Sequence, residues 1–236
     1  MKLYYNDEHI VAAYKPYGVL SEEDDKKPNM PALLNAQLGC EKIYTVHRLD
    51  RTTQGVTVYA KTREAASRLS ELIQNGGMEK TYLAVIEGEP QEPAGEMRDL
   101  LYFDRKKNKS FVVRRQRRGV KEAILRYETL QTQEIGGMTL TLVRIRLLTG
   151  RTHQIRVQFA SRRHPLAGDR RYGASAGGEI MLCASQLRFT HPFTGEELCF
   201  SYTPTDGYFG KYSIVIARGA KDKVEIAASE PCSSSQ

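Results

Sequence analysis

Two short stretches of this 236-residue chain are dense in polar side chains that could carry out chemistry. The first is HRLDRTTQG, residues 47–55, in which Asp50 stands between Arg48 and Arg51. Opposite charges this close favour the ionised form of a carboxylate. The second is LLTGRTHQIRVQ, residues 147–158. A carboxylate from the first stretch and a guanidinium from the second could form a buried ion pair.

The second stretch is expected to pass from a strand through a turn into a helix over residues 152–163. Arg151 falls at the turn, and Thr152 and Arg156, four residues apart, would share one face of the helix. Each of these candidate catalytic residues could instead have a purely structural role. A loop aspartate beside arginine is commonly a surface pair worth ~0–1 kcal/mol, and Tyr82, in an apolar strand, would ordinarily be a core residue.

A metal site is a further interpretation of the same residues. His47 and His153 could bind a metal together with Asp169, although their spacing matches no known ligand pattern. The four cysteines, at positions 40, 183, 199 and 232, form no Cys-x-x-Cys pair. The sequence also lacks a Gly-x-x-x-x-Gly-Lys-Ser/Thr loop, a G-x-G-x-x-G turn, His-Glu-x-x-His and G-x-S-x-G. Nucleotide-driven, hydride-transfer and zinc-protease chemistry are therefore disfavoured, and no metal is predicted.

Positive charge is concentrated in two parts of the chain. Lys and Arg total 35 against 28 Asp and Glu, for a net charge of +7. Residues 105–118 hold eight basic residues and no acid, and residues 144–171 hold eight arginines and one acid, Asp169. A protein that segregates charge in this way is suited to bind a polyanion, most commonly nucleic acid. A solvated surface is the alternative.

The elements that must position these residues are those of an α+β fold. The hydrophobic share of 40% and the charged share of 27% are typical of a globular protein. Strands in hairpin-like succession favour a mainly antiparallel or mixed central β-sheet flanked by a few helices and loops. The expected strands cover residues 9–15, 56–60, 82–86, 123–130, 139–148, 181–189 and 198–202. The expected helices cover residues 31–38, which begin at Pro31 and end before Gly39, 62–75, which Thr62 can cap and Gly76-Gly77 would end, and 152–163. Gly136-Gly137 could join strands 123–130 and 139–148 in a hairpin.

One domain is predicted over residues 1–228, with residues 229–236 a disordered tail. No apolar run approaches the ~20 residues that a membrane-spanning helix needs. Asp7 and Glu8 interrupt any signal-peptide pattern. We therefore expect a cytoplasmic protein without a membrane partner.

Five segments, in this order, resemble the motifs of the RluA-type pseudouridine synthases. They are KPYGVL (15–20), HRLDRTTQG (47–55), KTYLAVIEG (80–88), LLTGRTHQIRVQFASRRHPLAGDRRYG (147–173) and LCASQLRFTHP (182–192). The resemblance implies the pseudouridine synthase catalytic fold and the isomerisation of a uridine in ribosomal or transfer RNA to pseudouridine. It also implies that the chain begins almost at the catalytic domain, without a separate N-terminal RNA-binding domain.

The resemblance also assigns roles to single residues. Asp50 corresponds to the essential aspartate, Tyr82 to the tyrosine that stacks on the base, and Arg156 to the basic residue that pairs with the aspartate. Leu182 corresponds to an aliphatic residue of the pocket, and Arg48 to an arginine that helps displace the target base from its helix.

RNA binding is expected from residues beside these positions and from the first basic segment. Base or backbone contacts are predicted for His47, Arg151 and His153. Phosphate contacts are predicted for the four arginines Arg114, Arg115, Arg117 and Arg118.

This chemistry needs no cofactor, because one glycosidic bond is exchanged for another. RNA is the expected partner, without a nucleotide cofactor, and the chain is expected to be a monomer. Two other functions stay open. One is a non-catalytic RNA-binding or ribosome-assembly protein on the same fold. The other is a metal-dependent phosphoesterase that uses His47, Asp50, His153 and Asp169.

Overall fold

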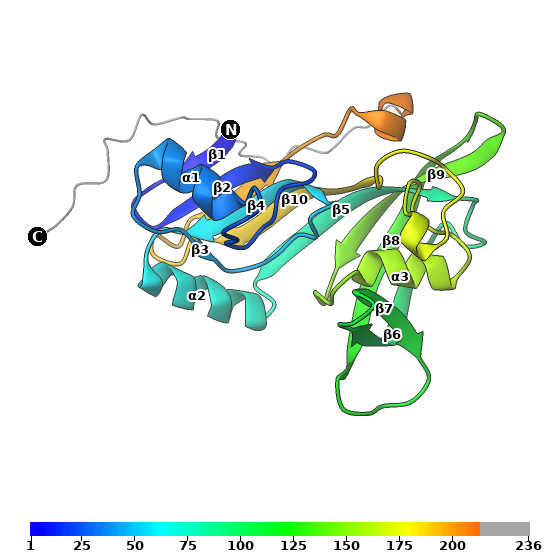
Figure 1. Cartoon of the computed structure of the whole chain (residues 1–236), viewed down its shortest axis with the longest axis horizontal. Helices are drawn as coiled ribbons and strands as arrows, with labels where there is room; N and C mark the ends of the chain where they lie inside the picture. Colours follow the sequence, from blue (N-terminus) through cyan, green and yellow to red (C-terminus); the bar gives the residue numbers. More distant parts are fainter. Residues whose placement is uncertain (213–236) are drawn as a thin grey trace, which may run out of the picture. The chain divides into compact units, whose positions relative to one another are not determined.

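The computed structural model describes residues 1–212, which form two compact units. Unit 1 contains residues 1–79 and 184–202, and unit 2 contains residues 80–183 and 203–212. Figure 1 shows the elements of both units. The prediction of one domain over residues 1–228 stays a prediction, and the predicted tail, residues 229–236, lies outside the described residues.

Unit 1 is built on antiparallel strands. β1 (Leu3–Asn6), β2 (Ile10–Lys15) and β4 (Gln54–Ala60) lie side by side, and the short β3 (Tyr44–Thr45) pairs with β4. β10 (Leu182–Thr190), most of which belongs to this unit, follows β4 in the sheet order and forms a hairpin with β11 (Glu197–Ser201). The predicted strands at residues 9–15, 56–60, 181–189 and 198–202 are therefore confirmed.

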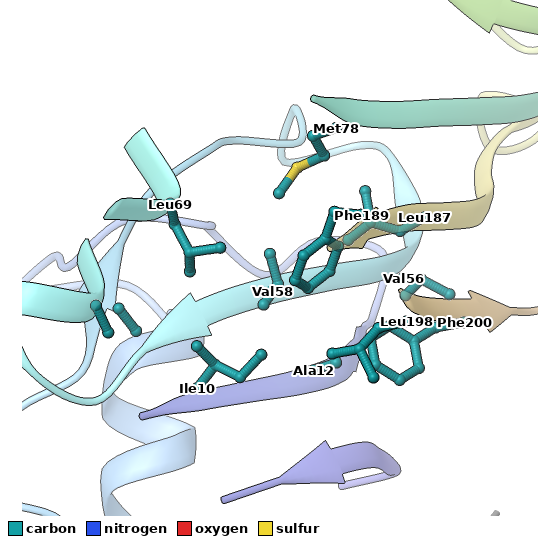
Figure 2. Close-up of a cluster of buried hydrophobic side chains, with 12 residues drawn as sticks. Ile10, Ala12, Val56, Val58, Leu69, Met78, Leu187, Phe189, Leu198 and Phe200 are labelled. Atoms are coloured by element: carbon teal, nitrogen blue, oxygen red, sulfur yellow. The ribbon is translucent and has the colours of Figure 1, made fainter. Parts of the chain in front are cut away.

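Both faces of β2 and β4 are buried. Ile10 and Ala12 of β2 and Val56 and Val58 of β4 point into one cluster, with Leu69 of α2 (Arg63–Gln74) among its other members (Figure 2). On the opposite face Val11, Ala13 and Tyr59 pack against Met30 and Leu34 of α1 (Met30–Leu38). Strands covered on both faces are apolar at successive positions, which explains the unbroken apolar run of β2.

The two helices of unit 1 begin and end at residues suited to those positions. The Asn29 side chain accepts the Ala32 N–H at the start of α1, and Gly39 ends this helix at φ +65°. The Thr62 hydroxyl accepts the Ala65 N–H at the start of α2. Both helices were predicted, α1 from Pro31 and Gly39 and α2 from Thr62 and the Gly76-Gly77 pair, and both predictions are confirmed.

Unit 2 contains a second set of antiparallel strands, in the order β5-β9-β8-β6-β7. Their bounds are β5 Met78–Glu87, β6 Ala94–Asp104, β7 Lys109–Val113, β8 Val120–Ile135 and β9 Met138–Leu147. Gly136 (φ +61°) and Gly137 (φ +76°) close the β8–β9 hairpin, as expected of a two-residue turn with both residues at positive φ. Unit 2 also holds α3 (Gln154–Ser161) and the 3₁₀ turns η1 (Arg170–Tyr172) and η2 (Gly207–Lys211).

The predicted fold class is confirmed by eleven strands and three α-helices within residues 1–212. One prediction of local structure is wrong. α3 begins at Gln154, so Thr152 precedes the helix and does not share a helical face with Arg156. The cause is His153, whose left-handed backbone (φ +54°) ends the helix on its N-terminal side. Within the same part of the chain, no helix is long and apolar enough to cross a membrane.

Gly168 allows two backbone segments of unit 2 to approach each other. It has φ +83°, and a Cβ there would lie 2.1 Å from the Glu179 carbonyl oxygen. We expect Gly168→Ala to lower the free energy of unfolding by at least ~2 kcal/mol, because a side chain at positive φ costs ~1–3 kcal/mol before the clash is counted. Urea unfolding measures this change.

Gly177→Ala is the matched control, because a Cβ at Gly177 meets no atom within 4 Å. The control is expected to unfold within ~0.5 kcal/mol of the wild type. Equal stability of the two variants would contradict the close approach at Gly168.

Candidate active site

Asp50 lies in the loop before β4, and its backbone neighbours are held by side chains of unit 1. The Ser21 hydroxyl donates to the Leu49 carbonyl oxygen (2.9 Å) and accepts the Leu49 N–H (3.0 Å). The Thr53 N–H donates to the Asp50 carbonyl oxygen (2.9 Å), which closes a turn. Asp50 itself is half-buried. The loop therefore presents its carboxylate from a fixed backbone.

Lys15, at the end of β2, holds the other side of this loop. Its side chain is fully buried, and its Nζ donates to the carbonyl oxygens of Thr53 (2.7 Å), Pro16 (3.1 Å) and Arg51 (3.4 Å). An ammonium group has three N–H donors, so these three acceptors satisfy it completely. Burial lowers the pKa of Lys15 to about 8, and the negative charge of Asp50 opposes that shift.

His47 and Arg48, on the same loop, have partners within unit 1. His47 Nε2 accepts the Val58 N–H at 3.2 Å. The Arg48 guanidinium is exposed and bonds the Glu22 carboxylate at 2.8 Å. An exposed pair of this kind contributes ~0–1 kcal/mol and is easily exchanged. Arg48 is therefore accessible to a ligand, and its predicted role in displacing a base stays a prediction.

Arg156, on α3 of unit 2, makes a two-point ion pair with Asp169. Arg156 Nε lies 2.6 Å from Asp169 Oδ2, and Nη2 lies 2.8 Å from Oδ1. The side chains are 5% and 0% exposed. A guanidinium held by two parallel bonds has a fixed plane and direction. Asp169 was predicted only as a possible metal ligand, so its role in orienting Arg156 was missed. The predicted pairing of Arg156 with Asp50 stays a prediction.

Asp169 owes its position to the segment that precedes it. The Ala167 N–H donates to the Val85 carbonyl oxygen of β5 (2.8 Å), and the Ala167 carbonyl accepts the Met181 N–H (3.0 Å). This segment is therefore hydrogen-bonded to β5 on one side and to the chain entering β10 on the other. Tyr82, on β5, and Leu182, at the start of β10, are 6% and 4% exposed. The segment that leads to Asp169 is thus hydrogen-bonded to β5, the strand that carries Tyr82, and to Met181, the residue just before Leu182.

His153 and Arg151 lie at the start of α3. His153 is buried, and its Nδ1 lies 3.0 Å from the Tyr172 hydroxyl. Arg151 Nε donates to the Glu122 carbonyl oxygen at 2.8 Å, and its N–H donates to Gln154 Oε1 at 3.0 Å. These contacts give both residues a structural role, and their predicted RNA contacts stay predictions.

The arginines between β7 and β8 differ from those on the neighbouring strands of unit 2. We call Arg114, Arg115, Arg117 and Arg118 the arginine turn. All four are exposed, and none of them makes an ion pair within residues 1–212; Arg117 stacks on the Tyr102 ring at 4.9 Å. On the strands, by contrast, arginines pair with glutamates: Arg98 with Glu96 and Glu122, Arg126 with Glu96, and Arg144 with Glu128. The arginine turn therefore carries positive charge that no carboxylate within residues 1–212 neutralises.

In the described part of the chain, no three His, Cys, Asp or Glu side chains are grouped so that they could hold a metal ion. Asp169, a ligand of the hypothetical phosphoesterase site, uses both carboxylate oxygens on Arg156. The phosphoesterase interpretation therefore lacks its fourth ligand.

Sequence comparison gives a family for this chain. The model of the RNA pseudouridylate synthase family matches residues 9–161. The tRNA pseudouridine synthase C of Vibrio parahaemolyticus is 32% identical over an alignment of 222 residues, gaps included, that covers 84% of this chain and 88% of that protein. The ribosomal large subunit pseudouridine synthase C of Escherichia coli O157:H7 is 33% identical over an alignment of 216 residues, gaps included, that covers 86% of this chain and 66% of that protein.

Solved structures have the same fold. The human RNA pseudouridylate synthase domain containing 4 superposes with a TM-score of 0.69 at 24% identity, over 85% of this chain and 87% of that one. The human RNA pseudouridylate synthase domain containing 1 superposes with a TM-score of 0.72 at 22% identity, over 86% of this chain and 83% of that one.

The family model spans more than half of the chain, and relatives above 30% identity align with most of it. The resemblance seen in the motifs is thereby confirmed, and the chain belongs to the RluA-type RNA pseudouridylate synthase family, whose enzymes isomerise uridine in RNA.

Proposed function

We propose that this enzyme converts one specific uridine of a structured transfer or ribosomal RNA to pseudouridine, with Asp50 as its essential carboxylate. Relatives of this chain are named for both RNA classes. The observation that carries the proposal is the loop of Asp50, whose backbone is fixed by Ser21 and by the buried Lys15. A catalytic group must be held to within a fraction of an ångström, and such a loop suits that task.

The reaction balances within one nucleotide. The bond from ribose C1′ to uracil N1 breaks, a bond from C1′ to C5 forms, C5 loses its proton and N1 gains one. A carboxylate can add to the base, attack the sugar or remove a ribose proton, and all three routes need it ionised. Arg156 is proposed to favour that charge state as the partner of Asp50.

The detached uracil must stay in place while it turns. Tyr82 is proposed to stack on the base and to help remove the C5 proton, and Leu182 to form an apolar wall. A dry, shaped pocket prevents loss of the base and strengthens each electrostatic contact. The 4–6% exposure of both side chains is compatible with such a lining.

The target base must leave its helix to be modified, at a cost of a few kcal/mol. Arg48 is proposed to take the vacated place, and His47, Arg151 and His153 to contact the nucleotide or its neighbours. The arginine turn is proposed to bind phosphates. A monomer in the cytoplasm stays the expected state of the enzyme.

Mapping pseudouridines in RNA from cells with and without this protein tests the function directly. The loss of one site would identify both the reaction and the substrate. Unchanged pseudouridine maps, together with specific RNA binding, would favour the non-catalytic alternative.

Asp50→Asn tests the essential carboxylate. We expect turnover below detection, because an amide can neither attack nor accept a proton, and RNA affinity near the wild-type value. Tritium release from uridine labelled at C5 measures turnover, and filter binding measures affinity. Asp25→Asn, at an exposed position of the same unit, is the control and should stay fully active. Pseudouridine formed by an Asp50→Asn preparation shown to be free of deamidation would overturn the assignment.

Replacing all four arginines of the arginine turn with glutamine tests phosphate binding. Each phosphate contact contributes ~0.7–0.9 to the slope of log K against log salt, so the slope should fall by about 3 if all four bind. A matched control replaces the glutamate-paired arginines Arg98, Arg126 and Arg144. An unchanged slope in the first variant would make the arginine turn a solvated surface.

The Lys15 ammonium predicts opposite effects of pH on activity and stability. A neutral amine has two N–H donors for three carbonyl acceptors, so the Asp50 loop should loosen and kcat should fall as pH rises through about 8. The folded pKa is below the unfolded value of 10.5, so the unfolded chain binds more protons between them. The free energy of unfolding therefore rises by ~1.4 kcal/mol per pH unit between about pH 8 and pH 10.5 because of this group, and is unaffected by it outside that range.

Lys15→Met should remove both effects. Activity profiles and urea unfolding between pH 7 and pH 10 measure them, with the exposed Lys42→Met as control. An alkaline fall of kcat near pH 8 that persists in Lys15→Met would show that another group titrates.

A further inference from the structure

The two basic segments of the sequence are joined in unit 2, where the turn between β6 and β7 is bonded to η1. Lys109 Nζ donates to the Arg171 carbonyl oxygen (2.6 Å), and Arg171 Nη1 donates to the Asn108 carbonyl oxygen (2.5 Å). β7 also lies beside α3 (Figure 1). Residues more than 60 positions apart in the chain thus form one surface.

Tyr172 is at the centre of this junction. Its hydroxyl accepts the Ser110 N–H of β7 (2.8 Å) and lies 3.0 Å from His153 Nδ1. Its ring centroid is 4.9 Å from Lys109 Nζ and 5.1 Å from the guanidinium carbon of Arg156. The same tyrosine therefore contacts the β6–β7 hairpin and the arginine proposed for the active site.

Ser110 adds a second link between the hairpin and the start of α3. Its hydroxyl donates to the Thr152 carbonyl oxygen at 2.5 Å, and its side chain is 1% exposed. The hairpin is thereby bonded to both η1 and the residue just before α3.

The exposed side chains of the β6–β7 turn and of η1 are cationic, apart from Asn108. We call Lys106, Lys107, Arg170 and Arg171 the tip surface; each is exposed, and none of them is paired with a carboxylate within residues 1–212. The two acids nearby are already engaged. Asp104 Oδ1 accepts the backbone N–H groups of Lys106 and Lys107. Asp169 is paired with Arg156. The positive charge of the tip surface is therefore available to an anion.

We propose that the tip surface binds the phosphate backbone of the RNA substrate, and that Tyr172 is the positioning residue that holds this surface in fixed register with Arg156. The proposal rests on the proposed function only in taking RNA as the ligand. Phosphate contacts set the position of a protein on its nucleic acid without reading sequence. Because the tip surface is preorganised, binding does not have to order the hairpin.

Tyr172→Phe separates this role from catalysis. The variant keeps the ring on Arg156 and Lys109 and loses the hydroxyl bonds to Ser110 and His153. We expect the Kd for a labelled RNA hairpin to rise about 3- to 10-fold. The loss should be larger in Kd than in the single-turnover rate at saturating enzyme, measured with RNA from cells lacking the protein, which carries the unmodified target. Tyr127→Phe, which removes an exposed hydroxyl bonded to Glu92, is the control.

A quadruple glutamine variant of the tip surface completes the test. It should weaken binding, with a smaller salt slope, and in its background Tyr172→Phe should have no further effect on Kd. A purely structural tyrosine would instead give independent, multiplicative losses, and that result would overturn the proposal. So would wild-type affinity and salt slope in the quadruple variant, which alters exposed residues only and stays informative if Tyr172→Phe fails to fold.

The outcomes also separate this proposal from the proposed function. Failure of the wild-type enzyme to form pseudouridine, with the binding results as expected, would refute the function and leave the tip surface supported. Full activity with no effect of the tip-surface variants on binding would refute the tip surface alone.

Discussion

A buried guanidinium must have its charge and its N–H groups satisfied, and the Arg156–Asp169 pair is the interaction on which the site of unit 2 depends. The two bonds of 2.6 and 2.8 Å fix the direction of Arg156 before any substrate binds. Removing one partner from such a pair costs ~3–5 kcal/mol, because the other charge stays buried. The pair in turn requires the bend at Gly168, where the chain passes within van der Waals contact of the 178–179 backbone.

Unit 1 meets the same requirement differently. Its buried cation, Lys15, is satisfied by backbone carbonyl oxygens of the Asp50 loop and of Pro16, without a carboxylate hydrogen-bonded to its Nζ in the contacts described above. The ammonium group thus holds the loop through carbonyl dipoles of its backbone. It also makes the loop geometry depend on a proton, since burial brings the lysine pKa to about 8.

The sequence predicted best where local chemistry decides the structure. Thr62 and Gly39 marked helix ends, and Gly136-Gly137 marked a hairpin, because caps and turns depend on neighbouring residues. β6 was not predicted. Its two most buried side chains, Met97 and Leu101, share one face of the strand, but the residue between them on that face is the polar Asp99, so the sequence shows no apolar–polar alternation. The motifs of the site were predicted through their resemblance to a family. The pairing of Arg156 with Asp169 was not, because it depends on a left-handed turn that brings together residues 13 positions apart.

The partners of the arginines show which positive charges of this protein are available to a polyanion. The stretch 144–171 contributes eight arginines, yet Arg144 and Arg162 are paired with carboxylates at the surface and Arg156 is paired in the interior. Arg171, next to Arg170 in η1, is bonded to the hairpin that carries Lys106 and Lys107, and the arginine turn follows that hairpin in the chain. Cationic side chains without carboxylate partners are thus concentrated on one hairpin and the turn bonded to it. Since binding to a polyanion releases counterions only where charge is uncompensated, affinity for RNA should depend on these positions and not on the net charge of +7.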